Sequence, residues 1–365
     1  MTYELLLAII TALYLAQIGM FLAGIRKVRD GRSSTEQPFV SVIIAARNEE
    51  RNIKPCLDSL TAQTYPKRSF EIVVVDDQSL DKTAAICLEY AAEHPNIRVV
   101  SSAAETTLRG KTNALAGGIK LAKGEIVMIT DADCIVPRTW IEATVKRYTP
   151  KVGIVGGMTL QRAWTAFEGM QSLDWAYLLG IAAAGVAWKN PLSTIGNNLS
   201  FRRKAYDDVG GYEKIPFSVT EDYSLFQAIV RTGKWDYLYP IDPALLVISK
   251  PCGTFGDLIR QKHRWGKGGL DMKVSGFVIM GLGFLMHAMI LAGPIFYWSV
   301  SVALTGLLVK LIGDYVFLYA VLNRLNKTSE LRYFHAFQLY YLLYVLALPF
   351  IVLFGRKVTW KGRQY

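Results

Sequence analysis

The segment Phe39-Val-Ser-Val-Ile-Ile-Ala-Ala46 is a continuous apolar run with the length of one buried strand. Three similar runs follow it, at Glu71–Asp76, Ile97–Val100 and Glu125–Thr130. Stretches of helical character lie between the runs and include Asn52–Ala62 and Thr83–Glu93. Strands that alternate with helices at these distances indicate βαβ units and a parallel sheet buried on both faces. We therefore expect an α/β domain over residues 38–250, with a mostly parallel sheet and flanking helices.

Polar residues gather where these strands end, and open parallel sheets bind ligands at that edge. Asp131 and Asp133 directly follow one strand, and two carboxylates so placed can hold a hard cation such as Mg²⁺ or Mn²⁺. Asp76 and Asp77 follow another strand and could accept hydrogen bonds from a base or a ribose. The alternative for all four aspartates is a turn in which they cap a helix.

Three further segments carry candidate residues. The run Arg109-Gly-Lys-Thr112 is similar to the end of a phosphate-binding loop, but Glu105 stands where that motif requires glycine. Lys111 is then a counter-charge for phosphate or a solvated surface lysine. Glu221-Asp222 opens a helical stretch, where acids cap well or could take a proton from an attacking hydroxyl. The segment Gln261-Lys-His-Arg-Trp265 lies in a basic stretch that is typical of an interfacial amphipathic helix.

Residues 1–25 form an apolar run long enough to span a bilayer. A cleaved signal peptide is the alternative, but the basic residues follow the run instead of preceding it: Arg26, Lys27, Arg29 and Arg32. Because positive residues mark the cytoplasmic flank, we expect Met1 outside and the following domain in the cytoplasm. The sequence thus predicts a multi-pass protein of the cell (inner) membrane.

The C-terminal third contains further apolar tracts. After an interfacial segment at 251–273, we expect about three membrane segments over 274–355, with a division at Gly293-Pro294. Lys310 and Asp314 interrupt one tract four residues apart, on one helical face, and could pair. The tail 356–365 is basic, as is the loop before the last tract, and one span separates them, so the side of the tail stays open.

Composition narrows the class of protein. Hydrophobic residues make up 52% of 365 residues, which argues against a disordered chain and against a plain soluble enzyme. The formal net charge of +11 fits nucleic acid, an anionic membrane surface or a phosphate-bearing substrate. Four scattered cysteines contain no CxxC pair, so a disulfide framework and a structural zinc site are not expected.

Seven segments in this order resemble the membrane-bound glycosyltransferases of family 2, which include cellulose and hyaluronan synthases and ceramide glucosyltransferases. The segments are VSVIIAARNEE, VVVDDQS, RGKTNAL, DADC, GNNLSFRRKAY, TEDYSL and QKHRW. The resemblance implies a Rossmann-like GT-A fold, a nucleotide-sugar donor, a divalent metal (Mg²⁺ or Mn²⁺) and inversion at the anomeric carbon. Phosphate contacts and juxtamembrane bases facing anionic lipid then account for the charge, and no nucleic-acid partner is expected.

The resemblance also implies roles for individual residues. The nucleotide would contact Ala45, Glu49, Asp76, Asp77, Lys111 and Asp131. The metal would lie at Asp131 and Asp133, with Asp133 the more direct ligand. Asp222 would be the general base, with Glu221 beside it. Gln261, Arg264 and Trp265 would match the family's QxxRW motif, with the arginine at the diphosphate and the tryptophan under the acceptor.

We expect transfer of a hexose, for example from UDP-glucose, to a lipid hydroxyl such as that of a hydroxylated carotenoid, a hopanoid or a ceramide. The first alternative is a processive polysaccharide synthase. The second is a membrane-anchored nucleotide-binding scaffold without turnover. A transporter fits less well, because no paired membrane repeat is visible.

Overall fold

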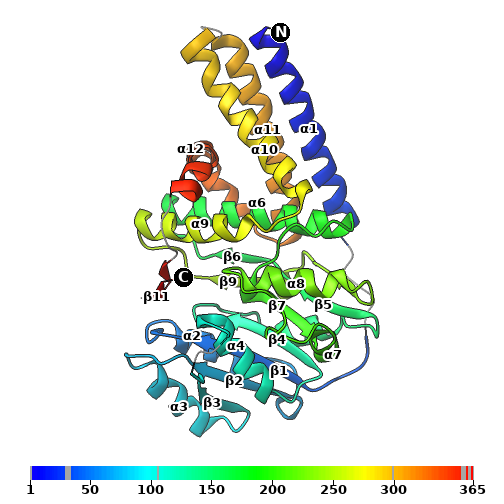
Figure 1. Cartoon of the computed structure of the whole chain (residues 1–365), viewed down its shortest axis with the longest axis vertical. Coiled ribbons are helices and arrows are strands. Elements are labelled where there is room, and N and C mark those ends of the chain that lie inside the picture. Colours follow the sequence, from blue (N-terminus) through cyan, green and yellow to red (C-terminus); the bar gives the residue numbers. More distant parts are fainter. Residues whose placement is uncertain are drawn as a thin grey trace. The chain divides into compact units, whose positions relative to one another are not determined.

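The computed structural model describes residues 2–28, 34–104, 107–297, 300–354, 359–360 and 363–364. It divides into two compact units (Figure 1). The first contains Met1–Val28, Gln161–Leu192 and Pro251–Val358, and the second contains Arg29–Leu160, Ser193–Lys250 and Thr359–Tyr365. The expected α/β stretch 38–250 therefore contributes to both units. Arg29, Arg32, Glu105 and most of the basic tail 356–365 lie outside the described residues.

The second unit is built on a sheet of seven strands in the order β3-β2-β1-β4-β7-β5-β8. The strands that precede residue 250 are β1 (Val40–Ala46), β2 (Phe70–Asp76), β3 (Ile97–Ser101), β4 (Ile126–Asp131), β5 (Val152–Gly156), β6 (Thr159–Gln161), β7 (Leu199–Arg202), β8 (Asp236–Leu238) and β9 (Val247–Ser249). The pairs among β1, β2, β3 and β4 are parallel, whereas β7 is antiparallel to both of its neighbours. The expectation of a mostly parallel sheet is confirmed.

The four predicted strands are confirmed to within one residue at each end. The helices of this unit are α2 (Ile53–Thr61), α3 (Thr83–Glu93), α4 (Gly110–Leu121), α5 (Trp140–Val145), α7 (Arg203–Asp208) and α8 (Glu221–Arg231), with 3-10 turns η1 (Lys67–Ser69), η2 (Gly196–Asn198) and η3 (Pro243–Leu245). Thus the two helical stretches predicted between the first strands, now α2 and α3, are also confirmed. Near the C-terminus, β10 (Thr359–Trp360) and β11 (Arg363–Gln364) form a short antiparallel pair.

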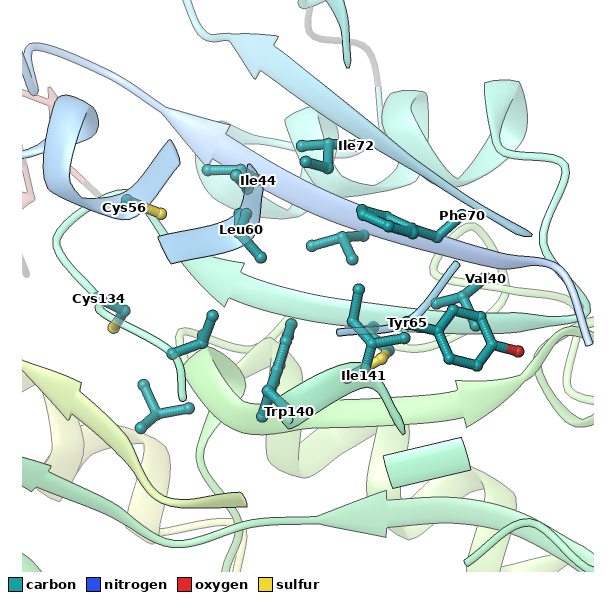
Figure 2. Packing of buried hydrophobic residues seen from close by; sticks show 14 of the residues in the cluster. Val40, Ile44, Cys56, Leu60, Tyr65, Phe70, Ile72, Cys134, Trp140 and Ile141 are labelled. Carbon is teal, nitrogen blue, oxygen red and sulfur yellow. The ribbon is translucent and has the colours of Figure 1, made fainter. Parts of the chain in front are cut away.

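Strand β1 is buried on both faces, as its continuous apolar sequence predicts. Ile44 belongs to the main hydrophobic cluster, in which Leu60 of α2 and Trp140 of α5 also lie (Figure 2). On the other face, α4 approaches closely at Gly118, where a Cβ would lie 2.8 Å from side-chain atoms of Ile43 and Val75. Helices therefore cover both faces of the parallel part of the sheet, as is usual for parallel strands.

The first unit is helical. Its helices are α1 (Tyr3–Lys27), α6 (Ala166–Ala187), α9 (Phe255–Gly269), α10 (Val274–Ala292), α11 (Val300–Arg324) and α12 (Phe334–Phe354), with a π-helical turn η4 (Gly293–Tyr297) and a 3-10 helix η5 (Thr328–Tyr333). Figure 1 shows α1, α10 and α11 running side by side. Helix α10 ends at Ala292 and η4 begins at Gly293, the expected point of division, although the apolar span continues to Phe296.

Among the described residues, four helices are long and apolar enough to cross a membrane: Tyr3–Lys27, Val274–Phe296, Val300–Arg324 and Thr328–Phe354. Three of them fall within the stretch 274–355 where we expect about three membrane segments. The fourth coincides with the expected N-terminal anchor.

The predicted Lys310–Asp314 pair is confirmed and belongs to a buried polar network in the first unit. Lys310 Nζ lies 2.9 Å from Asp314 Oδ2, and both side chains are almost fully buried. Gln338 of α12 donates to the same oxygen at 2.9 Å. Tyr14 of α1 and Tyr177 of α6 donate to Asp314 Oδ1 at 2.6 and 3.0 Å. One carboxylate thus joins four helices and has both oxygens satisfied.

We expect Asp314→Asn to lower the free energy of unfolding by about 3–5 kcal/mol, because it leaves a buried ammonium without a counter-charge. The double variant Lys310→Met/Asp314→Asn removes both charges and should recover most of that loss. Thermal unfolding of the purified chain in detergent, followed by tryptophan fluorescence, measures both variants. A double variant as unstable as Asp314→Asn would contradict this account.

Candidate active site

The parallel register brings the predicted nucleotide residues to one edge of the sheet. Ala45 is the register partner of Asp131, and Ala46 is that of Asp76. The backbone N–H of Asp77 donates to the Ala46 carbonyl at 2.8 Å, which joins the first residues after β2 to the end of β1. The strand ends that carry three of the predicted residues are therefore neighbours, as expected from the sequence.

The loops that follow β1 and β2 hold each other through side-chain hydrogen bonds. The Glu49 N–H donates to Thr83 Oγ1 at 2.7 Å, and the Glu50 N–H donates to Asp81 Oδ2 at 3.1 Å. In return, the Lys82 N–H donates to Glu50 Oε2 at 3.2 Å. These bonds fix the backbone position of Glu49, and its carboxylate accepts from Asn52 Nδ2 at 2.6 Å.

Asp76 and Asp77 do not cap the following helix, so that alternative is wrong for them. The residue before α3 is Lys82, and Asp81 supplies the acceptor for the Thr83 N–H. Asp77 is buried, and its Oδ1 accepts from Ser102 Oγ at 2.8 Å. Asp76 Oδ2 accepts from the Ser79 N–H at 3.4 Å, while its Oδ1 is buried without a hydrogen-bond partner in the described part of the chain.

Lys111 connects two of the predicted acids. Its Nζ lies 2.7 Å from Asp131 Oδ1 at the end of β4 and 3.3 Å from Glu221 Oε1 at the start of α8. Burial alone would lower the pKa of this ammonium, but the charges of Asp131 and Glu221 more than offset that effect and raise its pKa above the ordinary value. Lys111 is thus a charged, paired lysine, and the alternative of a solvated surface lysine is wrong.

Asp131 is the last residue of β4, and Asp133 follows with one residue between them. Neither caps α5, whose N-terminal flanking residue is Thr139. No group of three or more His, Cys, Asp and Glu side chains in the described part of the chain is arranged to hold a metal. This donor set still fits Mg²⁺ or Mn²⁺, because such ions are commonly bound by one or two carboxylates together with substrate phosphates and water.

Asp222 lies against the 3-10 turn η2. A Cβ on Gly196 would come within 3.2 Å of both Cβ and Oδ2 of Asp222, so the absence of a side chain there admits the carboxylate. Tyr212 is buried nearby: burial and the negative charges of Glu221 and Asp222 raise the pKa of its hydroxyl well above the usual range. The Asp222 carboxylate therefore lies against Gly196, and its charge acts on both the Tyr212 hydroxyl and the Lys111 ammonium.

Sequence reasoning assigned no role to the segment Gly196-Asn-Asn198, although the segment belongs to the motif order that carries the family resemblance. Asn198 donates through Nδ2 to the carbonyls of Met158 and Leu245, both at 2.8 Å, and accepts from Trp140 Nε1 at 3.0 Å. A buried asparagine with three long-range bonds fixes η2 in place and with it Gly196. The signal that could have identified this segment is its two asparagines, Asn197 and Asn198, directly before the apolar strand β7.

The Gln261–Trp265 segment lies on α9 in the first unit, whereas the acids above lie in the second. Lys262 of this segment is buried, while Arg264 and Trp265 are partly exposed. The Arg264 guanidinium makes no hydrogen bond or ion pair with the residues that the structure describes, and Gln261 Oε1 is buried without a hydrogen-bond partner among the same residues. The roles expected for Gln261, Arg264 and Trp265 stay predictions.

The mixed sheet, with acids gathered at the carboxyl ends of its parallel strands, has the architecture of GT-A glycosyltransferases. The mannosyltransferase PcManGT from Pyrobaculum calidifontis, solved in complex with GDP-Man and Mn²⁺, has the same fold, with a TM-score of 0.62 and 21% identity over 98% of this chain and 100% of that chain. Profiles described as "Glycosyl transferase family 2" and "Glycosyl transferase family group 2" match residues 41–210 and 126–354. The chain belongs to glycosyl transferase family 2.

Three relatives illustrate the range of the family. "Glycosyltransferase AglE" of Haloferax volcanii is 30% identical, with coverage of 74% of this chain and 86% of the relative. "Beta-monoglucosyldiacylglycerol synthase" of a Nostoc species is 31% identical over 64% of this chain, and "Poly-beta-1,6-N-acetyl-D-glucosamine synthase" of Staphylococcus epidermidis is 30% identical over 65%. The chain spans 49% and 56% of the length of these last two relatives.

We expect Gly196→Ala to reduce turnover by about tenfold or more, since the new Cβ displaces Asp222 by a few tenths of an ångström and catalytic geometry is sensitive to such shifts. Donor affinity should stay within twofold. Steady-state transfer rates and donor titrations measure the two effects. Gly117→Ala in α4, where a Cβ meets nothing within 4 Å, is the matched control. Unchanged turnover in Gly196→Ala would show that the close contact between Gly196 and Asp222 is not required.

Proposed function

We propose that this chain is a membrane-bound inverting glycosyltransferase that moves a hexose from a nucleotide-sugar to a hydroxyl of a lipid. The observation that carries the proposal is the Lys111 ammonium between Asp131 and Glu221, with Asp222 next in the chain. It supports a site where a phosphate-binding cation, metal-binding acids and a general base lie at the end of one sheet. In this proposal, the nucleotide contacts Ala45, Glu49, Asp76 and Asp77.

Charge balance supports a metal-dependent donor site. Asp131, Asp133, Glu221 and Asp222 are four acids, and Lys111 is paired with two of them. A diphosphate would add further negative charge, so its binding requires more positive charge than Lys111 supplies. Asp133 and Asp131 would hold Mg²⁺ or Mn²⁺, which would supply positive charge at the diphosphate leaving group.

The two adjacent acids of α8 have different surroundings, which supports different roles. The Glu221 carboxylate forms an ion pair with the Lys111 ammonium at 3.3 Å, which leaves it less available to an acceptor hydroxyl. The Asp222 carboxylate lies against Gly196. We assign Asp222 as the base that takes the proton from the acceptor hydroxyl while that oxygen attacks the anomeric carbon. A single displacement of this kind inverts the configuration and needs no covalent intermediate.

The proposal also assigns roles to the QxxRW segment of α9. Arg264 would stabilise negative charge on the departing diphosphate, and its lack of an intramolecular partner among the described residues supports that role. Trp265 would form the floor under the acceptor. Gln261 would orient this turn of the helix.

A lipid acceptor is supported by the four helices long enough to span a bilayer and by the relative named for the synthesis of monoglucosyldiacylglycerol. We place the protein in the cell membrane as a multi-pass protein with the α/β unit in the cytoplasm, because Arg26 and Lys27 end α1. Processive polysaccharide synthesis is the second candidate, since another relative is named for a polysaccharide.

Product analysis distinguishes the two candidates. Membranes that contain the chain are incubated with Mn²⁺, labelled UDP-glucose and added diacylglycerol, and the products are separated by organic extraction. We expect one labelled sugar per extracted lipid, and no label when the metal is chelated. Label confined to an insoluble polymer ladder would contradict the lipid acceptor, and the absence of label in both fractions with any of several nucleotide-sugars would contradict turnover.

We expect Asp222→Asn to reduce transfer by about 10²–10⁴-fold, which is the usual contribution of a general base. Donor binding should be preserved, since the amide keeps the size of the side chain. Transfer rate and nucleotide-sugar titration measure the two quantities. Asp236→Asn, at an exposed position on β8, is the control and should leave both unchanged. Normal transfer by Asp222→Asn would refute its role as base.

A further inference from the structure

Lys262 and His263 have no role in the proposed reaction, and Lys262 is the most buried residue of the Gln261–Trp265 segment. Lys262 is 1% exposed, and its Nζ donates a hydrogen bond to Asp174 Oδ2 of α6, a residue that is 5% exposed. Tyr340 of α12 donates to the same oxygen at 3.4 Å. A charged pair in this position is costly to form unless it is well matched, so its presence calls for an explanation.

The same lysine also contacts the tryptophan of the segment. Lys262 Nζ lies 4.5 Å from the centre of the Trp265 ring and 5.0 Å from that of Tyr344. On the other helix, Trp175 follows Asp174 directly, and its ring centre is 5.3 Å from that of Trp265. Two consecutive residues of α6 therefore contact one turn of α9, the first through the lysine and the second through the indole.

Helix geometry explains why these contacts act together. Residues three apart lie on the same side of a helix, so Lys262 and Trp265 can share contacts with α6. Residues two apart differ by about 200° around the axis, so Arg264 leaves the helix on the opposite side. The pair with Asp174 thus determines the rotation of α9 that puts Trp265 against Trp175 and directs Arg264 elsewhere.

We propose that Asp174 is a positioning residue: through the Lys262 ammonium it holds the Trp265 indole in the orientation that the acceptor requires. This inference rests on the proposed function, in which Trp265 forms the floor of the acceptor site. Without the Asp174 charge, the buried ammonium has no counter-ion and is drawn toward water. The attraction between ammonium and ring is then lost, and the indole is held by Trp175 alone.

A purely structural ion pair predicts a different pattern of effects. It would lower stability and reduce donor and acceptor use together, as the fraction of folded protein falls. Positioning of Trp265 predicts that the acceptor KM rises while donor affinity is kept. The two cases therefore differ in the change of the acceptor KM relative to the change of the donor affinity.

The kinetic test uses the full chain in detergent micelles with diacylglycerol as acceptor. We expect Asp174→Asn to raise the acceptor KM about tenfold, with donor affinity within twofold of the wild type. Lys262→Met should raise the acceptor KM, whereas Lys262→Arg keeps the cation and should have an acceptor KM close to that of the wild type. Asp257→Asn is the control, because it removes an exposed ion pair with Arg260 from the same helix. An unchanged acceptor KM, or equal loss of donor and acceptor use, would overturn the proposal.

A spectroscopic experiment needs no acceptor, so it tests the positioning role of Asp174 independently of the proposed function. Asp174→Asn should change the near-ultraviolet circular dichroism of the chain, and this change should vanish in a Trp265→Phe background. Wild-type protein that glycosylates no lipid, with this spectral change still present, contradicts the proposed function alone. Lipid glycosylation without a Trp265-dependent change contradicts the positioning role of Asp174. If Asp174→Asn does not fold, Lys262→Arg and Lys262→Met are compared in the same way.

Discussion

The in-register parallel pairing of β1 with β2 and β4 is the constraint on which the candidate site depends. Ala45 pairs with Asp131 and Ala46 with Asp76, so the loops that follow these strands begin at the same level. A slip of one residue would turn every side chain to the opposite face of the sheet. Such a slip is opposed by Ile43 under Gly118 on one face and by Ile44 in the main core on the other. The same packing that stabilises the sheet therefore sets the position of the acids.

The parallel half of the fold was predictable because each strand is short, apolar and bounded by polar residues. The second half was not predictable to the same degree. Strand β7 follows a long helix and inserts antiparallel between β4 and β5, and its four residues have no periodicity that reveals direction. Helix α6 groups with the apolar helices of the first unit, although its place in the sequence is inside the expected α/β stretch. Both features depend on partners distant in the chain.

The candidate site likewise contains residues that the sequence predicts and residues that it does not. The acids at the ends of β4 and β2 were found because they end or directly follow predicted strands. The Lys111–Glu221 contact could not be found in this way, because 110 positions separate the two residues and only the folded chain brings them within 3.3 Å. Gly196 was missed for another reason. Its contribution is the space that it leaves for Asp222, and a missing side chain has no chemical signature in a sequence.

Two buried lysines among the described residues of the first unit each restrict the rotation of the helix that carries them. A one-residue slide turns a helix by about 100°, and an apolar side chain then finds another apolar neighbour at little cost. Lys310 and Lys262 do not have this freedom, because an ammonium that leaves Asp314 or Asp174 is unpaired in a low-dielectric interior. For α9 the same pair places the Lys262 ammonium over the Trp265 ring, and Trp265 is the residue for which we propose a role under the acceptor.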